Sequence, residues 1–135
     1  MKVYIAGKLC DKEEREFLEK LARLCESMNF KTFLPHRDVG LAKRMKDVKR
    51  IFNGDVIEGF KNCKLIIASL NGLHVGAGTA WELGYAYANK IPAIGIKTDE
   101  KIEDAIDYLS AILIGSMKIV YSIEDLKKEL EKFKN

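Results

Sequence analysis

Short aliphatic runs alternate along this sequence with longer segments of helical periodicity, and this alternation strongly restricts the possible folds. The predicted strands are residues 2–6, 31–34, 64–70, 92–96 and 118–121, and at least one helical segment separates each pair. Strands joined through helices pair in parallel, with right-handed crossovers and helices on both faces of the sheet. We therefore predict an α/β three-layer sandwich of the flavodoxin-like type, a five-stranded parallel sheet with strand order 2-1-3-4-5.

The predicted helices carry recognisable start and stop signals. Asp11 with Glu14 forms a capping box before a helix that ends at Asn29, and Ser122 caps a last helix that runs to about residue 133. Residues 36–52 predict a loop and then an amphipathic helix, broken by Asn53 and Gly54. A short helix over residues 55–63 would then begin with Asp55 as its N-cap. The remaining helices are predicted from residue 78 or 79 to residue 88 and over residues 102–113.

Composition narrows the class of protein. A length of 135 residues predicts one domain over residues 1–135, and 47% hydrophobic with 32% charged residues is typical of globular chains. The net charge of +3 is spread along the chain, so no nucleic-acid polymer is expected as a partner. No leader precedes the first strand and no apolar run could span a membrane, so a cytoplasmic protein without a membrane partner is expected. The three cysteines lack metal-ligand spacing and are expected to be reduced thiols; neither a metal nor a cofactor is predicted.

The segment of residues 71–89 marks the expected site. Gly72, Gly76 and Gly78 lie where the buried strand of residues 64–70 passes into an apolar helix. Ligands of open α/β sheets bind at the carboxyl ends of strands, where a helix N-terminus offers free N–H groups. The glycine spacing matches neither a dinucleotide fingerprint nor a P-loop, because Trp81 stands where the last glycine is required and no Gly-Lys-Ser/Thr follows.

Glu82 is the one carboxylate of that helix. A surface glutamate on the wet side is the ordinary alternative, and spacing alone does not decide between the two. Its neighbours leave almost no polar face, so we expect a helix buried nearly all round, in which an ionised carboxylate needs partners. Trp81 and Tyr85 are interpreted as core or subunit contacts rather than platforms for a base. The surplus apolar surface predicts a homo-oligomer, at least a dimer.

The predicted strand order brings other side chains to the same crevice. Residues that directly follow strands converge there, and Tyr4 within the first strand and Asp55 could reach it; those directly after strands are Gly7, Lys8, His36, Arg37 and Asn71. Each also has an ordinary structural explanation. Tyr4 could be a core residue, Asp55 a plain cap, and Lys8 and Arg37 solvated charges.

Three stretches resemble a known family. YIAG at residues 4–7, GD at 54–55 and above all GTAWELGYAYA at 78–88 are similar to the nucleoside 2-deoxyribosyltransferases, and in part to the related deoxynucleoside 5′-monophosphate N-hydrolases. The resemblance runs from residue 1 to about 121. It implies cleavage of the bond between 2′-deoxyribose and a base, with Glu82 as nucleophile. It also implies that Tyr4 orients that carboxylate and that Asp55 lies near the sugar and base. Such a carboxylate can stabilise and capture an oxocarbenium-like centre, and the leaving base needs an acid.

The sequence also departs from the family pattern. Gly76 stands where transferases carry an aspartate and hydrolases a serine, and Asn71 replaces a frequent aspartate; His74 could supply a missing acid. Lys8 replaces the usual proline and could hold a phosphate. Ser116 aligns with a residue that reaches the neighbouring subunit's site. The predicted substrate-binding residues are therefore Gly7, Lys8, His36, Arg37, Asn71, Gly76, Gly78 and Ser116.

Three functions stay open at this point. The first is transfer of deoxyribose between bases, with a deoxynucleoside as substrate. The second is hydrolysis of a 2′-deoxynucleoside 5′-monophosphate, which Lys8 and Ser116 favour. The third is a non-catalytic nucleotide-binding module, because fold alone does not fix function.

Overall fold

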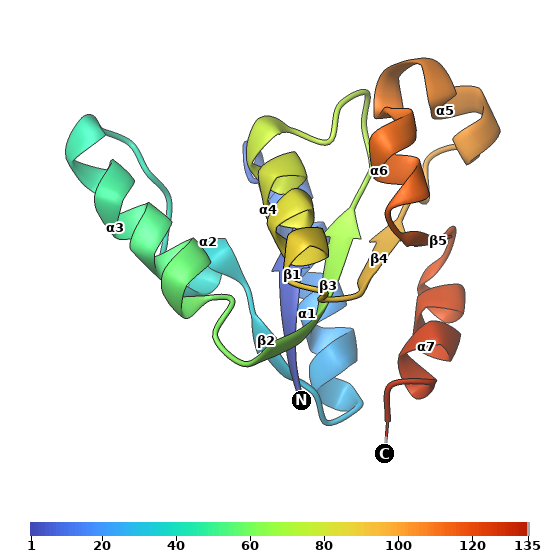
Figure 1. Cartoon of the computed structure of the whole chain (residues 1–135), viewed down its shortest axis with the longest axis horizontal. Helices are drawn as coiled ribbons and strands as arrows, with labels where there is room; N and C mark the ends of the chain where they lie inside the picture. Colours follow the sequence, from blue (N-terminus) through green and yellow to red (C-terminus); the bar gives the residue numbers. More distant parts are fainter. Residues whose placement is uncertain (135) are drawn as a thin grey trace.

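Five parallel strands form one sheet in the order β2-β1-β3-β4-β5 (Figure 1). The structure is a computed structural model and describes residues 1–134. The strands are β1 (Lys2–Ala6), β2 (Lys31–Phe33), β3 (Cys63–Ser69), β4 (Ala93–Ile96) and β5 (Lys118–Val120). The predicted fold class and strand order are confirmed, and β1 and β3 lie side by side at the centre with Tyr4 paired to Ile66.

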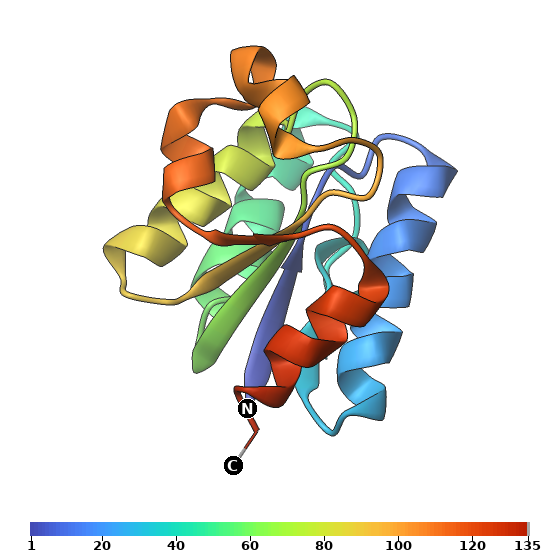
Figure 2. The ribbon, with the colours of Figure 1, turned by 90° about the vertical axis from the view of Figure 1, so that its right-hand side faces the viewer.

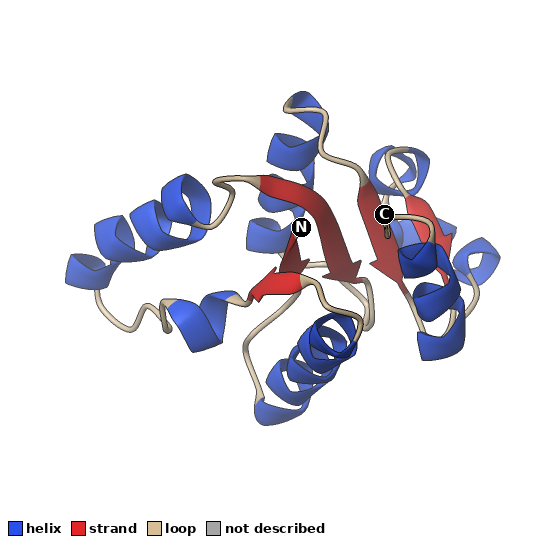
Figure 3. Ribbon diagram, turned by 90° about the horizontal axis from the view of Figure 1, so that it is seen from below, coloured by secondary structure: helices blue, strands red, loops and turns tan. Residues whose placement is uncertain are grey.

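Helices cover both faces of this sheet, as Figure 2 shows. Their bounds are α1 (Lys12–Ser27), α2 (Pro35–Asp38), α3 (Val48–Phe52), α4 (Ala77–Ala88), α5 (Ile102–Leu109), α6 (Ala111–Gly115) and α7 (Ile123–Glu131). A 3₁₀ turn, η1 (Met45–Asp47), precedes α3, and a π-helical turn, η2 (Asn53–Glu58), continues it. Figures 1 and 3 show α3 projecting from the sheet on the side away from α5.

The alternation of side chains along β1 separates two apolar layers. Val3 and Ile5 pack with α1 and α7, whereas Tyr4 and Ala6 face the layer that contains α4, α5 and η2. Tyr4 is fully buried, so its hydroxyl must find a partner inside that layer. The site described below depends on this orientation.

Two helix starts agree with their predicted caps. Asp11 accepts from the Glu14 N–H at 2.8 Å, and Glu14 accepts from the Asp11 N–H at 3.1 Å, which completes the capping box of α1. The Ser122 hydroxyl accepts from the Asp125 N–H at 3.0 Å and caps α7.

Two predicted helix boundaries are wrong. Asn53 and Gly54 do not break the helix, which runs on as η2, so Asp55 lies inside a π-helical turn instead of capping a new helix. Gly54 is needed for close packing, since a Cβ there would lie 2.7 Å from both methyl groups of Val39. The predicted helix over residues 102–113 is divided at Ser110, which has a φ of 83° and caps α6 through its hydroxyl.

A buried lysine ties the loop after β3 to the loop after β4. Lys97 is fully buried, and its ammonium donates to the carbonyls of Leu70 at 3.0 Å and Gly72 at 3.3 Å. Asp99 supplies the opposite charge at 2.9 Å and also accepts from the Gly72 N–H at 2.7 Å. Asn71 exchanges two hydrogen bonds with Thr98, at 2.8 and 2.9 Å. Hydrogen bonds with Lys97, Thr98 and Asp99 therefore hold the segment of chain that leads into α4.

We predict that Asp99→Ala lowers the free energy of unfolding by about 2 kcal/mol at pH 7. Fully unpairing a buried charge costs more, roughly 3–5 kcal/mol, but Glu100 remains 3.9 Å from Lys97. Urea denaturation measures the change, with Glu100→Ala as the control, expected to lose less than about 1 kcal/mol. An Asp99 variant no weaker than this control would contradict the role of Asp99.

The same pair predicts a pH dependence. Burial works to raise the pKa of Asp99, but the Gly72 N–H and Lys97 outweigh it and hold the pKa below its usual range. A depressed pKa stabilises the fold above the unfolded value of about 3.9 and loses this contribution as pH falls through the folded value. The difference between wild type and Asp99→Ala should therefore shrink below about pH 4.

Candidate active site

The Tyr4 hydroxyl donates a hydrogen bond of 2.5 Å to Oε2 of Glu82, joining β1 to α4. Both residues were predicted for the site, and the structure brings them together. The Tyr4 ring is held by Phe60, stacked at 4.2 Å, and by Phe33 at 5.1 Å. Because these two rings pack against it, the Tyr4 ring has little freedom to rotate. The core therefore fixes the Tyr4 hydroxyl, and the hydroxyl orients the Glu82 carboxylate.

Gly59 makes room for this tyrosine and was not identified from the sequence. A Cβ at Gly59 would lie 2.9 Å from the Tyr4 ring and 2.7 Å from the Phe33 ring. The glycine follows η2, so the π-helical turn can pack directly against the aromatic side chains of β1 and β2. In this region the sequence analysis identified only the GD pair at residues 54–55, and that pair indicated Asp55 and not Gly59.

Asp55 shares a cavity of about 450 Å³ with Glu82. Apart from these two carboxyls the lining is apolar, with Val48, Ile51, Phe52, Val56 and Trp81 among its residues. The Oδ1 atom of Asp55 is buried and has no hydrogen-bond partner within residues 1–134. Unsatisfied buried polar atoms are rare in folded proteins and call for an explanation, such as a ligand or water. Asp55 lies in the π-helical turn η2, a feature frequent at functional sites, and its half-buried side chain lines the cavity.

The environment raises the pKa of both carboxyls. Burial is the main cause for Glu82 and raises its pKa to about 7; the Tyr4 hydrogen bond opposes this and the charge of Asp55 adds to it. Burial likewise raises the pKa of Asp55 to about 6, with Arg50 acting in the other direction. The pKa of Tyr4 is raised by burial and by Glu82, so the phenol stays a donor. Between about pH 6 and pH 7 the two carboxyls together hold about one proton, and the higher pKa of Glu82 places it mainly on that residue.

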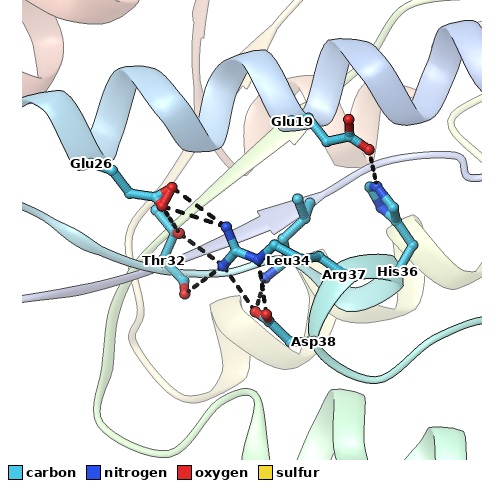
Figure 4. Close-up of polar contacts among 7 residues, drawn as sticks. All are labelled: Glu19, Glu26, Thr32, Leu34, His36, Arg37 and Asp38. Carbon is cyan, nitrogen blue, oxygen red and sulfur yellow. Dashed lines mark hydrogen bonds and ion pairs between the residues drawn. The ribbon is translucent and has the colours of Figure 1, made fainter.

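His36 and Arg37 lie elsewhere, as Figure 4 shows. His36 Nε2 lies 2.7 Å from Glu19 Oε2, and the Arg37 guanidinium bonds Asp38 and faces Glu26. Glu19 and Glu26 belong to α1, which covers the opposite face of the sheet. Because α2 starts at Pro35, directly after β2, its first turn directs these side chains toward α1. The structure does not bring them to Glu82.

Lys8 and Asn71 lie at the carboxyl ends of β1 and β3 but line a second cavity of about 450 Å³ with Thr98 and Asp99. The Lys8 ammonium pairs with Glu14 at 3.5 Å. Its side chain passes so close to two glycines of positive φ that a Cβ would meet it, at 2.7 Å for Gly72 and 3.0 Å for Gly76. Gly7 allows a similar approach, by Leu18. These residues therefore shape the loops around the site, and Lys8 does not line the Glu82 cavity.

Gly78 and Ser116 line different cavities, one on each flank of α4. Gly78 lies in the first turn of α4 and lines the Glu82 cavity. Ser116 donates to the Leu113 carbonyl at 2.9 Å and lines an apolar cavity on the other flank of α4, with Gly84, Tyr87 and Ile112.

The prediction that α4 is buried nearly all round is wrong. Its buried side chains are Thr79, Leu83 and Ala86, whereas Trp81 is 50% and Tyr87 69% exposed. The sheet covers one side of the helix only, because α3 and α6 lie beyond its two flanks and leave a cavity on each. Of the interpretation of Trp81 as a core or subunit contact, the core half is therefore wrong, and the subunit contact stays a prediction.

A sequence model described as nucleoside 2-deoxyribosyltransferase matches residues 3–130. The chain belongs to this family. Family membership confirms the resemblance stated above and supports an enzymatic function. Of the residues that the resemblance assigned to catalysis, Asp55 and Glu82 line one cavity, and Tyr4 donates a hydrogen bond to Glu82.

Solved structures share the fold of this deoxyribosyltransferase-family chain. A conserved protein of Enterococcus faecalis V583 is 26% identical, with a TM-score of 0.77 and 99% of both chains covered. A 2-deoxyribosyltransferase of Bacillus psychrosaccharolyticus is 20% identical, with a TM-score of 0.69 over 94% of this chain and 90% of that one. A CMP N-glycosidase of Clostridium botulinum is 18% identical, with a TM-score of 0.58 over 97% and 99%.

Comparison with curated proteins finds no match. Within residues 1–134, no helix is long and apolar enough to cross a membrane.

We predict that Glu82→Gln raises stability at alkaline pH. A carboxyl whose pKa rises from 4.5 to about 7 on folding stabilises the fold below the unfolded value, and this contribution is lost as pH rises through 7. Above that pH the wild type carries a buried charge that glutamine lacks. At pH 8 the free energy of unfolding of Glu82→Gln should exceed that of the wild type by about 2–3 kcal/mol, and this difference should vanish toward pH 4.

Urea denaturation across this pH range measures the effect, with Glu131→Gln on the exposed face of α7 as the control. Equal stability of wild type and Glu82→Gln at pH 8 would show that Glu82 is not held in a desolvated site.

Proposed function

We propose that this protein cleaves the N-glycosidic bond of 2′-deoxynucleosides through Glu82 and transfers the deoxyribose to a second base. The observation that carries the proposal is the Tyr4–Glu82 hydrogen bond at the wall of an apolar cavity that also contains Asp55. A deoxynucleoside needs an apolar site for the base, a nucleophile for C1′ and an acid for the leaving nitrogen. This cavity offers one group for each.

In the first half of the reaction a Glu82 oxygen bonds to C1′ as the bond from C1′ to the base nitrogen breaks. The bonding electrons leave with the base, and Asp55 donates a proton to it. In the second half the nitrogen of the incoming base attacks C1′, the ester bond breaks, and Glu82 regains its carboxylate; the proton lost by that base returns to Asp55. Two inversions at C1′ give net retention.

The protonation states constrain these roles. A nucleophile must be ionised and an acid protonated, whereas the pKa of Glu82, about 7, lies above that of Asp55, about 6, so a single proton resides mainly on Glu82 in the free protein. The proposed reaction therefore needs the proton to move from Glu82 to Asp55 when the substrate binds. Tyr4 fixes the carboxylate through one oxygen and leaves the other for C1′. The same arrangement argues against a module that only binds nucleotides, because binding alone has no use for a costly buried carboxylate.

Hydrolysis of a 5′-monophosphate is the alternative. It needs fixed donors for a dianionic phosphate beside the Glu82 cavity, and Lys8 faces the second cavity and pairs with Glu14 instead. This favours an uncharged nucleoside as the substrate.

A homo-oligomer stays part of the proposal. The apolar flank of α4 that carries Tyr87 faces Ile112, which is 82% exposed, and Ser116 lies in the same cavity. A second copy that covers this flank would bury surface that monomers rarely leave exposed.

Glu82→Ala and Glu82→Gln should abolish base release, and Tyr4→Phe should lower kcat about 10- to 100-fold. A nucleophile has no substitute and its loss costs several powers of ten, whereas a charge-assisted hydrogen bond contributes roughly 1.5–3 kcal/mol. Chromatography of each deoxynucleoside, with and without adenine as acceptor, follows the free base and the exchanged nucleoside. The exposed Glu131→Gln again serves as the control. Activity of Glu82→Gln within about tenfold of wild type would end the assignment of the nucleophile.

Asp55→Asn should lower kcat/KM by about 10²- to 10⁴-fold on ordinary deoxynucleosides, the usual contribution of a general acid. A deoxynucleoside of 7-methylguanine, whose base leaves as a neutral molecule without an added proton, should lose far less. Equal losses on both substrates would exclude Asp55 as the acid.

The pH profile gives a second readout of the same group. Wild type should show a bell with limbs near pH 6 and pH 7, where the carboxyl pair holds one proton. Asp55→Asn should show a single rise, at lower pH, because the charge of Asp55 no longer raises the pKa of Glu82.

A further inference from the structure

Trp81 lies at the wall of the Glu82 cavity instead of in the core. It directly precedes Glu82 on α4, lines the same cavity as Asp55, and is 50% exposed. Phe52 of α3 lines the cavity as well and is 46% exposed, with its ring 6.0 Å from the indole at an angle of 75°. Two large aromatic side chains thus remain partly open to solvent beside the two carboxyls. Monomeric proteins seldom expose neighbouring aromatic side chains, and such surface is typical of binding sites.

A row of aromatic rings in contact with one another holds the indole in place. Trp81 stacks on Tyr85, one turn along α4, with ring centres 5.5 Å apart and planes 10° from parallel. Tyr85 packs on Phe60 at 4.9 Å, and Phe60 stacks on Tyr4 at 4.2 Å. The rings therefore connect the exposed indole to the tyrosine that orients the nucleophile. A preformed aromatic surface costs little ordering entropy when a ligand binds.

The chemistry of this corner fits one part of the substrate. If Glu82 reaches C1′, the base lies one bond away from that carbon, and it must lie against a wall of the same cavity. The wall offers aromatic and aliphatic surface, with the Asp55 carboxyl as the polar group for a base nitrogen. A flat, uncharged heteroaromatic ring is the ligand that such a surface accommodates.

We propose that Trp81, flanked by Phe52, is the surface on which the substrate's base stacks, and so a specificity-determining residue; this rests on the proposed function. Every base has a π-face, so stacking tolerates many bases and selects by ring area more than by hydrogen-bond pattern. The site therefore accepts several bases and gains more from Trp81 with purines than with pyrimidines.

Fluorescence tests the contact without any reaction. The chain has one tryptophan, so its emission reports on Trp81 alone. In the Glu82→Gln variant, deoxyadenosine and adenine should quench this emission, cytosine should do so more weakly, and 2-deoxyribose should leave it unchanged. Unchanged emission at concentrations of deoxyadenosine that saturate binding in equilibrium dialysis would overturn the proposal.

Kinetics test its consequence. Trp81→Leu should raise the KM for deoxyadenosine about 10- to 100-fold, since stacking on one base contributes roughly 1–3 kcal/mol. The increase for deoxycytidine should be smaller, kcat should stay within about threefold, and Trp81→Phe should restore most of the affinity. Tyr87→Leu is the matched control, an exposed aromatic of α4 on the flank away from Glu82, and its KM should not change.

Light scattering of the same variants separates stacking from subunit contact. A Trp81→Leu protein that keeps its assembly state and loses affinity supports the proposal. One that dissociates, or one that raises KM no more than Tyr87→Leu does, overturns it. A different result would reject the proposed function, namely the absence of Glu82-dependent base release from any deoxynucleoside. Base release with an unchanged KM in Trp81→Leu would reject only the role of Trp81.

Discussion

One hydrogen bond, from Tyr4 on the central strand to Glu82 on α4, determines how the rest of this site is built. It joins residues 78 positions apart in the sequence and closes only if strand and helix meet at a fixed distance. The buried Lys97 ammonium, through its hydrogen bonds to loop carbonyls, fixes the loop before α4. Gly59 allows η2 to pack closely against the Tyr4 ring. A tyrosine that alternation alone would place in the core thus also hydrogen-bonds to the Glu82 carboxylate.

Burial of the Glu82 carboxylate opposes the stability of the fold when that group is ionised. The desolvation that raises the pKa of Glu82 costs free energy when it ionises, and the nearby Asp55 adds to the cost. Both groups line an apolar cavity to whose wall residues 1–134 contribute no third ionisable side chain. Such a pair would be selected against in a purely structural core, and sites with strained electrostatics of this kind are where activity and stability conflict.

Features with a local or periodic cause could be predicted from the sequence. The strand order follows from helices that alternate with aliphatic runs, and the α1 capping box follows from Asp11 and Glu14. Tyr4 and Glu82 came from the family resemblance together with an isolated acid in an apolar helix. Features decided by tertiary contact were missed. Gly54 predicts a helix break, whereas in the structure the helix continues as a π-helical turn in which Gly54 packs closely against Val39 and Asp55 lines the cavity.

The same reason explains the residues that strand order misplaced. His36 and Arg37 do follow a strand, but β2 is the edge strand and α2 begins directly after it. Both side chains therefore pair with acidic residues of α1, on the other face of the sheet. Lys97 gave no signal at all, because a lysine after a short strand reads as a solvated charge until the carbonyls of two loop residues are seen around its ammonium.

Helix α4 shows how one apolar segment can serve three surfaces. An amphipathic helix has one apolar stripe; a helix that is apolar all round normally lies inside a core or a membrane. Here the sheet covers Leu83 and Ala86, and the two flanks, marked by Trp81 and by Tyr87, each border an apolar cavity. Since exposed apolar surface is unfavourable in water, each flank calls for its own cover. Glu82 lies on the flank of Trp81 only. In the functional proposal the substrate therefore occupies that side, and the flank without a carboxylate is the one proposed to bind a second copy of the chain.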